Sequence, residues 1–373
     1  MAEPILRPFP RAAAFAESVP DAPARLGLGL RPALLGVLVL ALVIVFGVSL
    51  ALGSVSIPLQ QIITVLLGGE AERASWTNII LKFRLPKALT AALAGAALSV
   101  SGLMMQTLFR NPLASSDVLG INSGASLGVA LVVLSAGTVG TTVLAGIGLA
   151  GDVSLVLASI VGAALTLGLI LLIARQVENS LTLLILGLMI GQLTFALVSL
   201  LLYFSIPERI QAFVNWGFGS FNGVTWDQVP SLALPILIGL GMALLLSKSL
   251  NALLLGETYA RSLGMDTRRA RLAIIITTAI LTGAVTAFCG PIAFIGIAVP
   301  HLCRSLFNSS DHRALVPGVI LMGATVALIA ALIAEVPGSG LILPLNAIMA
   351  LFGAPVVIWV ILRQRNLQRA FAA

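Results

Sequence analysis

The chain has 373 residues, of which 59% are apolar and 9% are charged, and its mean hydropathy is +1.09. A soluble domain carries roughly 25% charged residues, so this composition excludes a water-soluble globule. The formal net charge of +7 does not indicate a nucleic-acid partner, because Lys and Arg lie in short clusters between long apolar runs rather than along one face.

The first segment, residues 1–31, is too polar for a secretory signal, and we expect a cytoplasmic arm. Beyond it, nine stretches of about 20 residues or more contain no Asp, Glu, Lys or Arg, and about 20 apolar residues cross a membrane. One of them, 272–303, is too long for a single crossing and should break at Cys289-Gly290-Pro291. The sequence therefore predicts an all-α membrane protein with ten spans within 32–363, and residues 364–373 as a cytoplasmic tail. The nine stretches are 32–69, 88–109, 118–151, 153–174, 179–207, 228–247, 272–303, 314–334 and 336–362.

The apolar half of the first stretch is followed by Gly53 and Pro58. We expect residues 57–67 to form a short amphipathic helix on the membrane surface.

The second span has two well-marked ends. Arg84-Leu85-Pro86-Lys87 precedes it, Gly95 and Gly102 lie within it, and Arg110-Asn111-Pro112-Leu113-Ala114 follows it. Because proline interrupts a helix, we expect a break at each end.

An internal repeat is also indicated. Small residues and a proline of the second span recur 188 positions later: Gly95-Ala96, Gly102 and Pro112 as Gly283-Ala284, Gly290 and Pro300. With ten spans the two copies run in opposite directions, as in inverted-repeat transporters. The alternative is that small residues simply allow close packing of membrane helices.

The cytoplasmic loop 249–270 contains a short predicted helix, on which Glu257 and Arg261 form an i,i+4 pair and which Gly264 would cap. Such a charged, capped helix outside the membrane is typical of a docking element. The alternative is a solvated connector.

The distribution of Lys and Arg predicts orientation. With ten spans both termini share one side, which carries sixteen of these residues against five on the other. The positive-inside rule places both termini in the cytoplasm.

Several kinds of chemistry have no sequence signal. No span has a charged residue near its middle, which disfavours a carrier driven by an ion gradient. The chain has no G-x-x-x-x-G-K-[ST] phosphate loop, so energy should come from a partner. Cys289 and Cys303 lie in apolar sequence, where we expect core residues rather than a disulfide or metal site. We expect no cofactor and no bound metal. A non-transporting scaffold would not explain the polar, proline-broken span ends.

Taken together, these motifs resemble the permease subunits of the FecCD family, whose members import vitamin B12, ferric siderophores and haem. The resemblance covers about 33–363. It rests on Arg84-Leu85-Pro86-Lys87, Asn111-Pro112-Leu113-Ala114, Gly256-Glu257 through Ala260-Arg261 to Gly264, Gly290-Pro291, Phe294-Ile295-Gly296, Val299-Pro300-His301, Asp311-His312-Arg313 and Gly353-Ala354-Pro355.

The resemblance implies a type II ABC importer permease in the bacterial inner membrane, which is not itself an enzyme. It implies a second permease subunit, which is a second copy in a homodimer or else a close homologue, together with two ATP-hydrolysing subunits and an external substrate-binding protein. The expected cargo is an iron chelate, first a ferric siderophore, with haem or cobalamin as alternatives. An ion-gradient-driven carrier is the alternative from another class.

The resemblance also implies roles for individual residues. A further basic docking position of the vitamin B12 member falls on Glu335 here, which indicates a differently charged partner. We expect His301 and His312 to be structural. The implied sites are binding-protein docking at Arg84 and Lys87; a cytoplasmic gate at Asn111, Leu113, Ser180 and Leu181; ATPase coupling at Gly256, Glu257, Ala260, Arg261 and Gly264; and a translocation path at Gly187, Gly191, Gln192 and Asn346.

Overall fold

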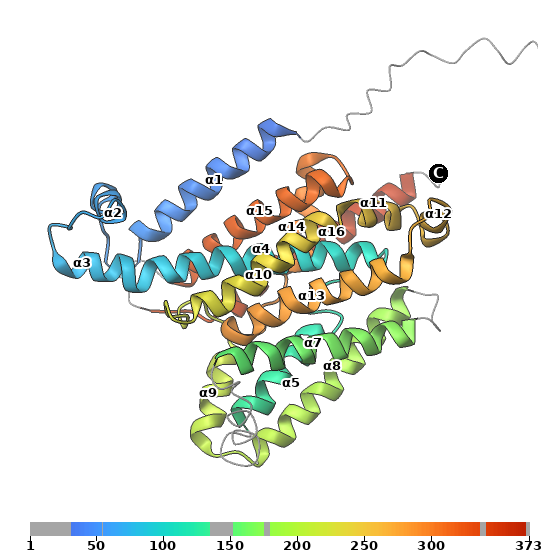
Figure 1. The fold of residues 1–373 in the computed structure, drawn as a ribbon, viewed down its shortest axis with the longest axis horizontal. Coiled ribbons are helices and arrows are strands. Elements are labelled where there is room, and N and C mark those ends of the chain that lie inside the picture. Colours follow the sequence, from blue (N-terminus) through green and yellow to red (C-terminus); the bar gives the residue numbers. More distant parts are fainter. Residues whose placement is uncertain (1–30, 54, 135–151, 175–179, 336–340, 371–373) are drawn as a thin grey trace, which may run out of the picture. The chain divides into compact units, whose positions relative to one another are not determined.

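The structure is a computed structural model that describes residues 31–53, 55–134, 152–174, 180–335 and 341–370. The expected N-terminal arm, except Arg31, and the last three residues lie outside these ranges. The described residues form one unit built of helices, with a single isolated antiparallel bridge between Glu335 and Ile342 (Figure 1). The expected all-α fold is confirmed for this part of the chain.

Helix α1 (Pro32–Ala51) is apolar along its length and packs mainly against α15. Only Leu38 and Leu50 of this helix are buried, as expected for a helix in contact with lipid. The predicted amphipathic helix is present as α2 (Leu59–Leu66), which buries Ile62 and Val65 and exposes Leu59 and Ile63. Its contact with a membrane surface stays a prediction.

The next helix is longer than the sequence indicates. Helical backbone runs without interruption over Ala74–Leu108, through α3 (Ala74–Asn78), a π-helix (Ile79–Arg84) and α4 (Leu85–Leu108). The expected break at Pro86 is therefore wrong. The wider turns of the π-helix immediately precede Pro86, and an adjustment of this kind accommodates a residue that cannot donate a backbone hydrogen bond.

Helix α4 lies at the centre of the described unit, between α15 and α13 (Figure 1). Two of its glycines make this close packing possible. A Cβ atom on Gly95 would lie 2.2 Å from the carbonyl oxygen of Gly323 in α15 (His312–Ala334), and one on Gly102 would lie 1.9 Å from that of Gly296 in α14 (Ile295–Phe307). Membrane helices associate mainly through close van der Waals packing, which small residues such as these glycines allow.

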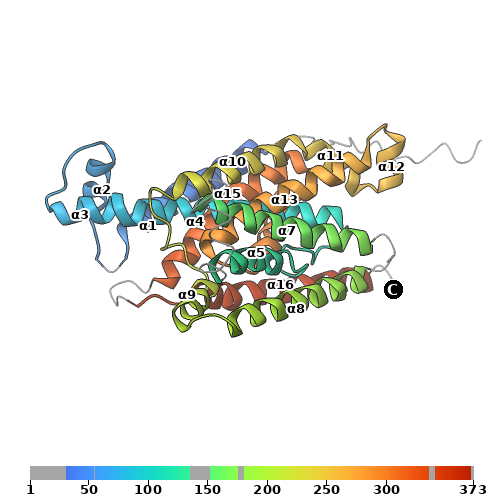
Figure 2. The same ribbon diagram turned by 60° about the horizontal axis from the view of Figure 1, so that its bottom comes forward.

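The middle of the chain forms a second group of helices: α5 (Ile121–Leu134), α7 (Asp152–Ala174), α8 (Ser180–Tyr203) and α9 (Pro207–Gly217). Helix α5 packs on α7 and α8, and α7 packs on α13. Figure 2 shows α8 and α16 along the same side of the unit, beyond α5.

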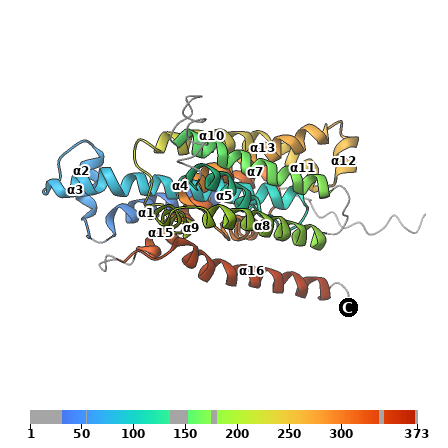
Figure 3. The same cartoon turned by 90° about the horizontal axis from the view of Figure 1, so that it is seen from below.

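The last group begins with α10 (Val229–Leu245), which bends by 53° into α11 (Ser247–Leu254), and α12 (Glu257–Ser262) follows. Helix α13 (Thr267–Cys289) ends at the predicted break, and α14 begins after Phe294. The break at Cys289-Gly290-Pro291 is confirmed. Helix α16 (Leu345–Ala370) closes the described chain and lies at one side of the unit (Figure 3).

Six of the described helices are long and apolar enough to cross a membrane, and the bent α10–α11 pair would make a seventh. Three further apolar helices are shorter, over Ile121–Leu134, Ile295–Phe307 and Leu345–Trp359. The chain is therefore a multi-span helical membrane protein.

The two ends of the unit differ. Helices α11 and α12 lie at one end, which we call the α12 end, together with the C-terminal end of α4 (Figure 1). Helices α2 and α3 lie at the opposite end, which we call the α2 end (Figures 1 and 3).

Candidate functional site

The short helix α12 forms as the sequence predicts. Gly256 precedes it with φ +113°, a conformation that L side chains rarely adopt, and Gly264 follows it with φ +80°. The amide of Gly264 donates to the carbonyl of Arg261, so the glycine ends the helix in the left-handed conformation. Ala260 is fully buried, which fixes the opposite side of α12 against the body of the protein.

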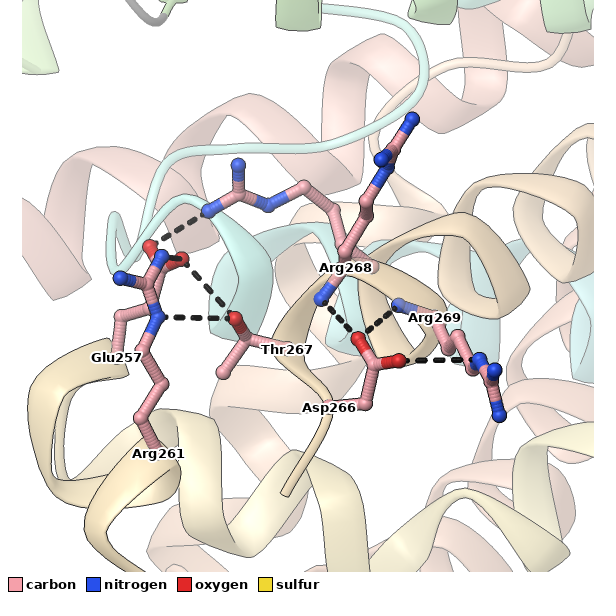
Figure 4. A network of polar contacts seen from close by, with 7 residues as sticks. Glu257, Arg261, Asp266, Thr267, Arg268 and Arg269 are labelled. Carbon is pink, nitrogen blue, oxygen red and sulfur yellow. Dashed lines mark hydrogen bonds and ion pairs between the residues drawn. The ribbon is translucent and has the colours of Figure 1, made fainter. Parts of the chain in front are cut away.

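Glu257 is the centre of an ion network beside α12 (Figure 4). Its carboxylate accepts hydrogen bonds from Arg261 Nη2 and Arg271 Nη2, each at 2.7 Å, and from the hydroxyl of Thr267 at 3.3 Å. Arg261 Nε also donates to Thr267 Oγ1 at 3.2 Å. Because Arg271 and Thr267 belong to α13, the network ties α12 to that helix.

The network also acts on the ionisation of Glu257. Partial burial raises the pKa of its carboxyl, but the charges of Arg271 and Arg261 and the hydrogen bonds outweigh burial and hold the pKa below its usual range. The carboxylate is thus ionised at neutral pH. The ion pairs are lost only as the pH falls through this lowered pKa.

Three apolar residues in or next to α12 are exposed, beside polar residues that are exposed as well. Leu255, Tyr259 and Leu263 are 63%, 49% and 63% exposed. We call these three residues the α12 ridge. An exposed apolar ridge on a charged helix is a surface to which another protein can bind.

The loop after α4 lies close to α12. Arg110 begins it with φ +48°, and a Cβ on Gly256 would lie 3.8 Å from Arg110 Nη1. Asn111 is buried and its Oδ1 accepts from the amide of Leu113 at 2.9 Å, which holds the turn through Pro112. The carbonyl of Pro112 is 2.8 Å from His301 Nε2 in α14. The structure thus brings the expected gate residues Asn111 and Leu113 to the same end as the expected coupling helix.

The structure describes only the backbone of the other two expected gate residues. Ser180 and Leu181 are the first residues of α8, but their side chains lie outside the described residues.

Three of the expected path residues lie on α8, and the fourth, Asn346, lies on α16. Gly187 is buried, because a Cβ there would lie 2.9 Å from Leu119 Cα, whereas Gln192 on the same helix is exposed. Gly191 lies beside Gly120. Asn346 of α16 instead bridges two backbone segments: its Nδ2 donates to the carbonyls of Gly217 at 3.2 Å and Pro291 at 2.6 Å.

Sequence reasoning missed the other side chains that hold the break between α13 and α14. Asp117 Oδ2 accepts from the amide of Phe294 at 3.2 Å, and Asn122 Nδ2 donates to the carbonyl of Ile292 at 3.1 Å. Phe294 has φ +67°, so this segment is strained and needs such support. In the sequence, Asp117 and Asn122 are visible as two polar residues on either side of a short apolar run. Only the fold shows that they bind the backbone of the break.

At the α2 end, Arg84 is only 8% exposed. Its guanidinium donates to the carbonyls of Leu50 at 2.7 Å and Ala51 at 2.9 Å, and also to that of Val55. Arg84 was expected to be an exposed docking residue, but it is buried here and its guanidinium donates to carbonyls at the end of α1. Arg84 instead ties the end of α1 to the π-helix.

Lys87 is also engaged, but less fully. Its Nζ lies 2.5 Å from Glu335 Oε2, and the two side chains are 17% and 28% exposed. The pair lines a small pocket with residues 219–222 and with Leu343 and Leu345. Glu335, which stands where the resemblance leads us to expect a basic docking residue, is therefore the ion-pair partner of Lys87.

The family model that matches this sequence settles the class. The FecCD transport family matches residues 40–363. The chain belongs to this family.

Two curated relatives agree with this assignment. The hemin transport system permease protein HmuU of Yersinia pestis is 36% identical over 333 residues, which cover 88% of this chain and 96% of the relative. The vitamin B12 import system permease protein BtuC of Klebsiella pneumoniae is 37% identical over 298 residues, covering 80% and 86%. Both are named as permease proteins, so the chain is a transport subunit and not an enzyme.

A solved structure shares the fold. A chain of a metal-chelate type ABC transporter in an inward-facing conformation has a TM-score of 0.74 and 30% identity, and the match covers 89% of this chain and 99% of that one. The resemblance seen in the sequence is thus confirmed along most of the chain.

Proposed function

We propose that the chain is the membrane permease of an ATP-driven importer for a metal chelate. One observation carries the proposal: the family match extends over residues 40–363, and within it α12 is a folded, capped helix with an exposed apolar ridge. The relatives named for hemin and for vitamin B12 are almost equally identical to this chain, at 36% and 37%. They therefore favour a metal chelate as cargo but do not distinguish hemin from vitamin B12. A ferric siderophore, expected from the sequence, belongs to the same class and stays a prediction.

The proposed assembly contains a second copy of the permease, two ATPase subunits and a substrate-binding protein. The α12 ridge, with Glu257 and Arg261 beside it, suits a groove of the ATPase. Both termini would then face the cytoplasm of the cell, in the inner membrane of a bacterium, and the α2 end would face outward.

The proposed topology has ten spans. The six long helices, the bent α10–α11 helix and the three shorter apolar helices support this count, because each overlaps one of the predicted spans. An inverted repeat is supported by the opposite directions of α4 and α13 (Figure 1). It is supported further by Gly95 and Gly283, each of which lies against a neighbouring helix, Gly323 of α15 and Ile160 of α7 respectively.

We assign the roles as follows. Gly256 to Gly264 couple the permease to the ATPase, and the loop at Asn111 and Leu113 closes the path at the α12 end, with Ser180 and Leu181 as its predicted partners. Gly187, Gly191, Gln192 and Asn346 remain the predicted path. Docking of the binding protein falls to Lys87 and the surface around its pair with Glu335.

The test is reconstitution of the complete complex in proteoliposomes. ATP hydrolysis and uptake are measured with a ferric siderophore, haem and cobalamin, each on its own binding protein. We expect one chelate to raise both rates. Uptake driven by a proton gradient in the absence of the ATPase would overturn the proposal.

A further inference from the structure

Three polar side chains from three helices meet at the α12 end. Asn251 belongs to α11, His312 is the first residue of α15, and Thr107 lies in the last turn of α4. Asn251 Oδ1 lies 2.8 Å from the backbone nitrogen and 2.8 Å from Nδ1 of His312, and His312 Nε2 lies 2.7 Å from Thr107 Oγ1. We call Asn251, His312 and Thr107 the polar relay.

The hydrogen bonds fix where the ring proton lies. Asn251 Nδ2 donates to Asp311 Oδ1 at 2.6 Å, so the amide oxygen of Asn251 faces His312. That oxygen accepts, and therefore Nδ1 of His312 carries the proton and donates to it. In the neutral ring Nε2 is then an acceptor, and the Thr107 hydroxyl donates to it.

The hydroxyl of Thr107 has a second acceptor within reach. The carbonyl of Leu103, one turn earlier in α4, lies 2.9 Å from Thr107 Oγ1. One proton cannot serve both acceptors, so rotation of the hydroxyl moves its hydrogen bond from His312 to Leu103. Release of the link between α15 and α4 thus leaves only the acceptor Nε2 of His312 unpaired, while the hydroxyl donor stays paired, which lowers the cost of breaking it.

The relay joins the two parts of the proposed machinery. Asn251 is on the helix that leads through Gly256 into α12. Thr107 stands one turn before Asn111, and its carbonyl accepts from the amide of Arg110 at 3.2 Å. Thr277 and Thr325, in contrast, are buried threonines that bond within their own helices, to the carbonyls of Ala273 and Leu321.

We propose that Asn251, His312 and Thr107 are positioning residues that transmit the movement of α11–α12 to the end of α4 and its gate loop. His312 and Thr107 are each 1% exposed, so no solvent competes for these bonds. The inference deepens the proposed function and rests on it. It adds to α12 a specific, releasable contact between the coupling helix and the gate.

The experiment measures the amount of cargo transported for each ATP hydrolysed by the reconstituted complex. Thr107→Val removes the hydroxyl and keeps the shape of the side chain. Asn251→Ala breaks the other end. We expect each to lower the transported amount per ATP by about two- to tenfold, the range that one net hydrogen bond gives, with the binding of ATPase subunits unchanged.

Three further variants separate transmission from stability. Thr325→Val makes the same chemical change in α15, outside the relay, and should keep the wild-type ratio. Thr107→Ser restores the hydroxyl and should restore the ratio. In a connected relay either break interrupts the link, so the double variant Thr107→Val with Asn251→Ala should lose no more than the worse single variant.

The outcomes distinguish this inference from the proposed function. A wild-type complex that shows no ATP-driven uptake contradicts the proposed function itself. If the wild-type complex is coupled but Thr107→Val transports as much cargo per ATP as Thr325→Val, the relay is overturned and the proposed function stands. Additive losses in the double variant also overturn it, because independent effects on stability add. If Asn251→Ala does not assemble, the comparison of Thr107→Val, Thr107→Ser and Thr325→Val decides the question.

Discussion

At the scale of the residue, Arg84 and Lys87 differ although the sequence presents them as one basic motif. A motif gives the residue types and their spacing, but not the carbonyls at the end of α1 that occupy the guanidinium of Arg84. Those carbonyls belong to residues more than thirty positions away, so no local pattern could reveal them. Lys87 has one partner, Glu335, and is partly exposed.

Replacing these two residues should therefore have different effects. Arg84→Lys loses hydrogen bonds to buried carbonyls and should lower the free energy of unfolding by about 1–3 kcal/mol. Lys87→Met removes one partly exposed ion pair with Glu335, so it should cost less stability than Arg84→Lys but should weaken docking of the binding protein. Thermal unfolding in detergent and a binding titration check both. Equal losses of stability, or unchanged docking with Lys87→Met, would contradict the assignment.

At the scale of the element, the sequence predicted helices well and their ends less well. Charge-free runs give the spans because the membrane demands about 20 apolar residues, and Gly290-Pro291 gives the break because both residues interrupt a helix. Pro86 carried the same local signal, but the preceding π-helix accommodates it. The strained Phe294 and its partners Asp117 and Asn122 could not be predicted, since they come together only when the helices pack.

Helix packing gives the next prediction. Gly102→Ala would place a Cβ 1.9 Å from the carbonyl oxygen of Gly296, so α4 and α14 must separate. We expect a loss of at least about 1–3 kcal/mol, the usual cost of overpacking. Gly36→Ala in α1 is the control, because nothing lies within 4 Å of its Cβ position. The melting temperature of each purified variant checks this, and equal values would show that the α4–α14 contact yields easily.

At the scale of the whole molecule, the α12 end collects elements that are far apart in the sequence. The gate loop follows α4, the coupling helix follows α11, and the network of Glu257 joins α12 to α13. The sequence showed each part but not their proximity, which depends on the direction and packing of the helices between them. A movement of α12 therefore has short structural routes to α13, to α15 and to the end of α4.

Breaking the network of Glu257 should uncouple the complex. Glu257→Gln keeps the shape of the side chain but removes the negative charge that holds Arg271 and Arg261, so α12 should no longer move as one body with α13. We expect ATP hydrolysis to continue while uptake for each ATP falls by about tenfold, the effect of ~1.4 kcal/mol. Arg268→Ala removes a neighbouring charge whose side chain points away from Glu257 (Figure 4), and it should behave as wild type. Rates of hydrolysis and uptake in the same proteoliposomes check this. Uptake for each ATP that is equal in the two variants would mean that α12 transmits its movement without its tie to α13.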